Sequence, residues 1–81
     1  MKMGAWYVLA ADVRDEIDAK RMAAIINHQG PQIPARVVSK ESSHRVIAGP
    51  FNDIKEAKEA IKRLKIDLEL DGRLIEPTRK R

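Results

Sequence analysis

The sequence is short of several residue types on which common protein chemistry depends. It has no cysteine, and tryptophan, tyrosine and phenylalanine occur once each among 81 residues. Without cysteine there is no disulfide framework, no thiolate zinc site and no thiol nucleophile, which largely excludes metal and redox chemistry. The apolar run at residues 5–11 is much shorter than the ~18–20 residues of a membrane span, so we expect neither an export signal nor a membrane span in this chain. A chain of this length is expected to form one domain.

The excess of positive charge is concentrated at one end of the chain. The 16 Lys and Arg residues outnumber the 12 Asp and Glu residues and give a formal net charge of +4. Arg79, Lys80 and Arg81 supply three of these charges, so residues 1–78 hold 13 basic and 12 acidic groups. We interpret residues 78–81 as a basic C-terminal tail and residues 1–5 as an N-terminal stub. Because the chain without its tail is almost neutral, the charge gives little support to nucleic-acid binding.

The sequence resembles itself at an offset of 38 residues, which indicates two half-repeats within a domain at residues 6–77. The matched pairs are Val8 with Val46, Leu9 with Ile47, Ala10 with Ala48, Asp15 with Asp53, Ala19 with Ala57 and Ile26 with Leu64. Each half begins with a short apolar run typical of a strand, at residues 6–11 and 45–49. Each then continues into a helical pattern.

Both helical patterns combine an acidic start with an apolar stripe. Asp15 and Asp53 are predicted N-caps, because a carboxylate there accepts hydrogen bonds from unpaired backbone N–H groups. Gly30 followed by Pro31 predicts the end of the first helix. The predicted stripes are Ile17, Ala19, Met22, Ala23 and Ile26 in the first helix, and Ile54, Ala57, Ala60, Ile61 and Leu64 in the second. Two further strands are predicted at residues 32–40 and 73–76, with a hairpin turn at 41–43.

The resulting order, βαββαβ, predicts an α+β fold of the ferredoxin-like or RNP-like kind. We expect a four-stranded antiparallel sheet with both helices on one face and the two repeated strands at its centre. Strand alternation predicts that Val8, Ala10, Val46 and Ala48 face the helices. It places on the open face Tyr7, Leu9, Ala11, Arg45, Ile47 and Gly49. An apolar pair of Leu9 and Ile47 beside Tyr7 on an uncovered sheet is a candidate binding or self-association patch.

Two segments of the chain carry a family resemblance. They are residues 6–13, WYVLAADV, and residues 44–51, HRVIAGPF, supported by Ala19, Gly30 and the run GPFND that leads into Ala57, Ala60 and Leu64. They resemble the repeated core of the SPOR (sporulation-related repeat) domain, and the resemblance covers residues 6–77. It implies a non-catalytic module of the bacterial cell envelope that binds peptidoglycan, as in septum-targeting domains of cell-division and wall-remodelling proteins. It also implies a preference for glycan strands denuded of their stem peptides, bound on the open sheet face.

The resemblance further implies which residues bind the glycan. Arg45 matches a position where family members carry a basic residue important for glycan binding. Three positions depart from the family, because Leu9 replaces a frequent Gln, Asp12 a common Ser and Ser43 a frequent aromatic residue. Leucine cannot hydrogen-bond a sugar hydroxyl, and Tyr7 is the candidate replacement for the missing ring. The candidate ligand-binding residues are therefore Arg45, Tyr7, Leu9, Asp12, Ser43 and Ile47.

Two binding functions of other classes compete with this interpretation. A protein-interaction or homodimerisation module would use the apolar surface of Tyr7, Leu9 and Ile47. RNA binding suits the βαββαβ order, because the RNA-recognition motif shares it. The strand at residues 45–49 lacks the aromatic rings on which that motif stacks bases, so nucleic acid is disfavoured as a partner.

Catalysis is the least favoured function. His28 and His44 belong to no Ser/His/Asp or paired-carboxylate constellation that the repeat would bring together. We therefore expect no enzyme activity, no cofactor and no metal. The expected location is the periplasm or cell envelope if the chain is part of a larger protein, and the cytoplasm if it is complete as given.

Overall fold

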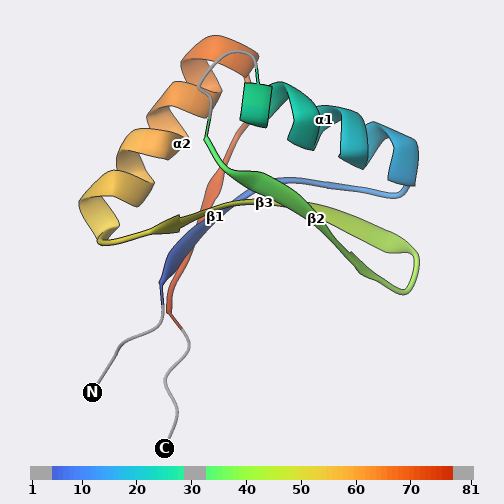
Figure 1. Ribbon diagram of the computed structural model, residues 1–81, viewed down its shortest axis with the longest axis horizontal. Helices are drawn as coiled ribbons and strands as arrows, with labels where there is room; N and C mark the ends of the chain where they lie inside the picture. The colour runs from blue at the N-terminus through green and yellow to red at the C-terminus, as the bar shows by residue number, and fades with distance from the viewer. Residues whose placement is uncertain (1–4, 29–32, 78–81) are drawn as a thin grey trace, which may run out of the picture.

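The chain alternates strands and helices in the order that its repeat predicts. The computed structural model describes residues 5–28 and 33–77. The elements are β1 (Trp6–Val13), α1 (Glu16–His28), β2 (Ala35–Lys40), β3 (Ser43–Phe51), α2 (Ile54–Leu68) and β4 (Arg73–Ile75). The strands form one sheet in the order β2-β3-β1-β4 with every neighbouring pair antiparallel. Both helices cover one side of this sheet and leave the other uncovered (Figure 1), so the predicted α+β fold is confirmed.

Acidic caps begin both helices, as their sequences predict. The Asp15 carboxylate accepts a hydrogen bond from the backbone N–H of Ile17 at 2.9 Å. Asp53 accepts one from the N–H of Glu56, also at 2.9 Å. These bonds satisfy N–H groups that have no partner inside the helix. The predicted cap at Gly30 and Pro31, the first four residues of the stub and the basic tail at 78–81 lie outside the described residues.

The core lies between the helices and the two central strands. Its buried residues are Val8, Ala10, Val46 and Ala48 from the sheet, Ala19, Ala23 and Ile26 from α1, and Ala57, Ala60 and Leu64 from α2. The many alanines let the helices approach the sheet closely. Two predicted stripe residues do not join this core, because Ile17 is 65% exposed and Ile54 is 40% exposed. Each lies in the first turn of its helix, beyond the stretch that packs on the sheet.

The connections at the ends of α1 and α2 are held by side chains. Asn27 at the end of α1 exchanges two hydrogen bonds with the backbone of Ala35, at 2.8 and 2.9 Å. These bonds place the start of β2 at Ala35, three residues later than the sequence predicts. After α2, Lys65 donates to Asp71 at 3.0 Å, and this hydrogen bond together with the Asp71 charge raises the pKa of Lys65. Neither helix is long and apolar enough to cross a membrane within the described residues.

An extra residue in β1 changes which of its side chains face the helices. Leu9 pairs with Ile47 and Ala11 with Val46, which leaves Ala10 as a bulge without a partner of its own. The alternation of faces therefore shifts by one residue after Ala10. A single inserted residue has this effect because side chains alternate with a period of two.

Ala11 is consequently not on the open face, where regular alternation predicts it. Ala11 packs against the core together with Val13, because both follow the bulge. Asp12 lies between them in the strand and opposite Arg45 in the sheet. The open-face prediction for Ala11 was wrong, and the bulge is the physical reason.

A second irregularity, in β3, restores the register. Trp6 pairs with Phe51 and Val8 with Ala48, so β3 has one residue more than β1 between these pairs. Gly49 lies in this stretch with a φ of 131°, a conformation that residues with a side chain rarely adopt. The two irregularities cancel, and the strands stay paired over their whole length.

Candidate functional site

The side of the sheet away from the helices carries the candidate site. Tyr7, Leu9 and Asp12 reach it from β1, and Ser43, Arg45 and Ile47 reach it from β3. These two strands are the central pair of the sheet, so the six side chains form one continuous surface, which we call the open face. The structure therefore brings together all six residues that the sequence names as ligand-binding candidates.

The centre of the open face is apolar. Leu9 and Ile47 are direct partners across β1 and β3, and both are half-buried. Their neighbours in the same row are Arg36 on β2 and Arg73 on β4. One row across all four strands thus reads arginine, isoleucine, leucine, arginine, with the apolar pair flanked by a cation on each side.

A polar cluster adjoins this row on one side. Arg45 Nε lies 3.4 Å from a carboxylate oxygen of Asp12, and the hydroxyl of Ser43 donates a hydrogen bond to the other oxygen. The side chains of Arg45 and Asp12 remain 51% and 44% exposed. An ion pair this exposed contributes about 0–1 kcal/mol to folding. Its main effect is to hold the Arg45 guanidinium beside a compensating negative charge.

An aromatic ring adjoins the row on the other side. The guanidinium carbon of Arg36 lies 5.8 Å from the centroid of the Tyr7 ring, which is a cation–π contact. Arg36 is on β2, so this contact reaches across β3, and it does so at Gly49. A Cβ atom on Gly49 would meet Tyr7 Cδ1 at 2.9 Å. Because Gly49 has no side chain, the Tyr7 ring can lie close to the backbone of β3 at this position.

The edge strands supply residues that the sequence-based site omits. Arg36, Val38 and Lys40 of β2 pair with open-face residues of β3, and Arg73 and Ile75 of β4 pair with those of β1. Their side chains therefore share the open face. The alternation in β2 was a usable signal, because Val37 between two exposed residues packs against the core. What the sequence did not contain was the register of the edge strands against the central pair.

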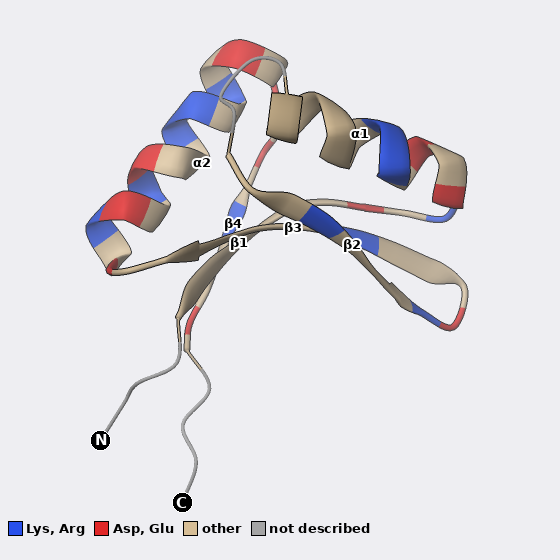
Figure 2. Cartoon of the chain, viewed as in Figure 1, with Lys and Arg blue, Asp and Glu red and all other residues tan. Residues whose placement is uncertain are grey.

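The charge of the open face differs from that of the chain as a whole. Among residues 5–28 and 33–77, four basic side chains lie on it, Arg36, Lys40, Arg45 and Arg73, against the single carboxylate of Asp12. Figure 2 shows basic positions on β2, β3 and β4, whereas acidic positions gather mainly on the helices and connections. The net charge of the chain without its tail is therefore close to zero even though the open face is cationic, because the helical side carries both basic and acidic residues.

The two histidines lie outside this face. His28 is exposed at the end of α1, and His44 lies on the core side of β3, where its Nδ1 is 2.7 Å from the hydroxyl of Ser39. Within residues 5–28 and 33–77 no three His, Asp or Glu side chains are grouped as they would be around a metal ion. The open face therefore offers hydrogen bonds, charge and apolar contact, which are the means of binding a ligand.

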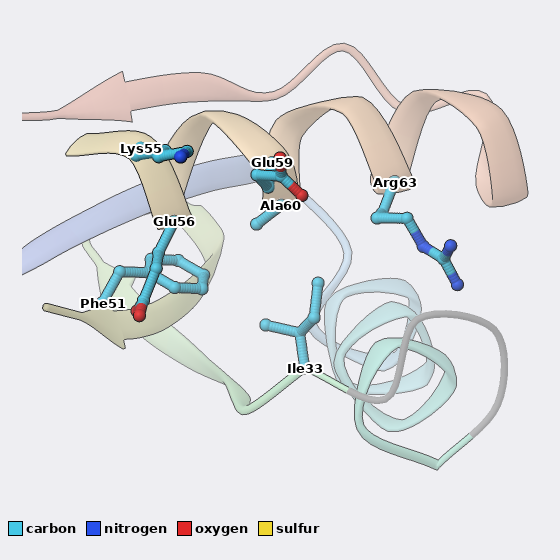
Figure 3. A pocket seen from close by; sticks show the side chains of 7 residues that line it. All are labelled: Ile33, Phe51, Lys55, Glu56, Glu59, Ala60 and Arg63. Carbon is cyan, nitrogen blue, oxygen red and sulfur yellow. The ribbon is translucent and has the colours of Figure 1, made fainter. Parts of the chain in front are cut away.

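A separate hollow of about 390 Å³ lies on the helix side of the sheet. Figure 3 shows Phe51, Ile33 and Ala60 around it, with the charged side chains of α2 at its rim. These charged residues are Lys55, Glu56, Glu59 and Arg63. The hollow opens away from the open face and includes none of the candidate site residues.

Comparison with known proteins points to one family. The family model described as the SPOR domain matches residues 2–72. The peptidoglycan binding domain of the B. subtilis cell wall lytic enzyme CwlC superposes with a TM-score of 0.75 at 20% identity, covering 93% of this chain and 92% of that one. The RlpA SPOR domain from Pseudomonas aeruginosa gives a TM-score of 0.74 at 17% identity, with 89% and 99% covered. No curated protein matched the chain.

Proposed function

The chain belongs to the SPOR domain family, and from this membership we propose that it is a non-catalytic peptidoglycan-binding module. Its ligand is the glycan strand that has lost its stem peptides, and its site is the open face. The observation that carries the proposal is the apolar pair of Leu9 and Ile47. No helix covers this pair, and hydrogen-bonding side chains of the central strands lie next to it. A sugar presents apolar C–H surface and hydroxyl groups side by side, so such a surface is complementary to it.

Each side chain of the site has a part in this proposal. Leu9 and Ile47 form the floor against which a sugar ring packs. Arg45 retains N–H donors beyond the one directed at Asp12, and the Asp12 carboxylate and the Ser43 hydroxyl accept from sugar hydroxyls. The departures from the family at Leu9, Asp12 and Ser43 therefore leave a surface that still combines apolar and polar contacts.

Tyr7 supplies the aromatic surface that the family usually has elsewhere. Its ring lies on the same face as Leu9 and next to it in β1, and the cation–π contact with Arg36 orients it. A ring held in one orientation loses less side-chain entropy when a sugar packs on it. A module with these properties acts where peptidoglycan is, in the periplasm or cell envelope, and directs a larger protein to its substrate.

Self-association through the same apolar surface is the competing function. The charge of the open face argues against it. If two copies packed open face against open face, the four basic side chains described on one copy would lie opposite those of the other. Like charges opposed in an interface are unfavourable. A ligand with hydroxyl or acidic groups meets no such repulsion.

Co-sedimentation with peptidoglycan tests the proposal. We expect the protein to pellet with intact peptidoglycan and to pellet more after an amidase has removed the stem peptides. Leu9→Asp places a charge in the apolar floor and should leave the protein in the supernatant. Ile66→Asp is the matched control, because Ile66 is 67% exposed on α2 and the same substitution there should not change pelleting. Circular dichroism would verify that both variants are folded.

Two outcomes would contradict the proposal. In the first, the wild-type protein stays in the supernatant with both preparations. In the second, Leu9→Asp pellets as well as the wild type, which would remove the open face as the site.

A further inference from the structure

The two arginines of the edge strands differ from Arg45 in their surroundings. Arg45 has the Asp12 carboxylate beside it. Within the described residues, no carboxylate lies within ion-pair distance of Arg36 or Arg73. The undescribed residues contain no Asp or Glu that could supply one. Among the described residues, Arg36 and Arg73 are thus the guanidinium groups of the open face that have no carboxylate partner.

Both arginines are placed to meet a ligand that lies across the strands. They pair with Ile47 and Leu9 respectively, so they border the apolar floor on opposite sides. The cation–π contact between Arg36 and Tyr7 consumes no N–H donor, so the guanidinium can still form the paired hydrogen bonds that carboxylates accept.

The proposed ligand has an anionic group of this kind. Removal of a stem peptide hydrolyses the amide bond that joins it to the lactyl group of muramic acid. The lactyl carbonyl carbon, neutral in the amide, then belongs to a free carboxylate. Each stripped muramic residue therefore carries one negative charge on the glycan itself, at a place where the intact glycan has a neutral amide.

Resting on the function proposed above, we propose that Arg36 and Arg73 bind the lactyl carboxylates of stripped glycan strands and so distinguish these strands from intact ones. Charge complementarity favours this occupant, because the strands that the structure describes place four basic side chains and one acidic one on the open face. Arg45 has a lesser part in this discrimination, since Asp12 already balances its charge.

The separation of the two arginines indicates a polymeric ligand. They lie on the two edge strands, three inter-strand spacings apart, which is about 14 Å at the usual ~4.8 Å between strands. A ligand that engages both guanidinium groups from these positions needs more than one carboxylate. A glycan strand meets this requirement because muramic acid recurs along it.

Two forms of the same glycan test this proposal. One is the soluble glycan chain released after amidase treatment, and the other is that chain with its carboxylates converted to neutral N-methyl amides. Isothermal titration calorimetry would measure both affinities for the wild type and for Arg36→Gln, Arg73→Gln and Arg63→Gln. Arg63, on the exposed side of α2, is the matched control for the loss of one positive charge.

We expect amidation to weaken wild-type binding by about tenfold, as two exposed charge-assisted contacts would predict. Arg36→Gln and Arg73→Gln should each weaken binding of the acidic glycan by about threefold to fivefold. Arg73→Gln should leave binding of the amidated glycan unchanged, whereas Arg36→Gln should weaken it by a smaller factor than the acidic glycan, because this variant also loses the contact that orients Tyr7. Arg63→Gln should change neither affinity.

The results separate this proposal from the one on which it rests. Equal wild-type affinity for the two glycans would overturn carboxylate recognition while leaving glycan binding in place. The same conclusion would follow if the two variants weakened both glycans equally, or if Arg63→Gln had the same effect as they do. Absence of wild-type binding to either glycan would overturn the proposed function itself, and this inference with it.

Discussion

Replacement of Gly49 by alanine tests how the backbone of β3 makes room for the open face. Gly49 has a φ of 131°, where an L side chain is strained. A Cβ atom there would lie 2.9 Å from Tyr7 Cδ1, 3.1 Å from the Trp6 carbonyl oxygen and 3.3 Å from Phe51 Cδ2. Ordinary carbon–carbon contacts are about 3.5–4.0 Å, so the Tyr7 ring must move by at least roughly 0.6 Å. The Trp6 carbonyl belongs to the backbone of β1 and cannot yield without disturbing the pairing of β1 with β3.

These contacts set the expected loss of stability. Backbone strain of this kind costs about 1–3 kcal/mol, and overpacking against neighbours that cannot all yield costs about 1–3 kcal/mol more. We expect Gly49→Ala to lower the free energy of unfolding by about 2–6 kcal/mol in total. In a domain of this size each kcal/mol corresponds to roughly 4–8 °C in Tm, so the Tm should fall by at least roughly 8 °C.

Thermal and urea unfolding, followed by circular dichroism, would measure this loss. Gly72→Ala is the control, because Gly72 has no positive φ and the three atoms nearest to its added Cβ would all be side-chain atoms, the first being Val8 Cγ1 at 3.0 Å. Its cost should be clearly smaller. If the Tm of Gly49→Ala stays within about 2 °C of the wild type, or Gly72→Ala loses as much, the reasoning from backbone strain is refuted.

Three further predictions concern the core, one ion pair and the oligomeric state. Leu64→Ala should cost about 2–5 kcal/mol in urea unfolding because Leu64 is fully buried, whereas Ile66→Ala at an exposed position should stay within about 0.5 kcal/mol. The raised pKa of Lys65 means that its bond with Asp71 stabilises the fold fully below the ordinary lysine pKa and is lost as the pH rises through the raised value. The small difference in Tm between wild type and Asp71→Asn should therefore vanish in strong alkali. Light scattering at high concentration should give the monomer mass, and a dimer would contradict the repulsion expected between two open faces.

The internal repeat made most of the fold predictable. An offset that aligns strand with strand and helix with helix predicts two similar halves, and the pairing of Leu9 with Ile47 confirms that equivalent positions meet at the centre of the sheet. The helix caps at Asp15 and Asp53 were predictable for a local reason, since a cap depends on its own residue and the next few. Helix ends and edge strands were less accurate. The start of β2, for instance, depends on hydrogen bonds from Asn27, eight residues earlier.

The site was only partly predictable because its composition depends on contacts between strands. The six residues of the central strands follow from alternation and resemblance. Arg36 and Arg73 join them only through the register of the edge strands, which short segments such as β4 do not specify by pattern. The net charge was misleading for a related reason. A total close to neutral is compatible with a cationic face when the acidic residues lie mainly on the helices and connections.

The bulge at Ala10 is the feature on which the polar half of the site depends. In a regular strand Asp12 would share a face with Val8 and would point toward the helices, where an unpaired carboxylate costs several kcal/mol. With one extra residue in β1, Asp12 turns to the open face beside Arg45, and its neighbour Val13 turns to the core. The bulge thus satisfies an apolar and a charged residue together. It also decides which arginines remain uncompensated, because Arg45 acquires a carboxylate partner only through it.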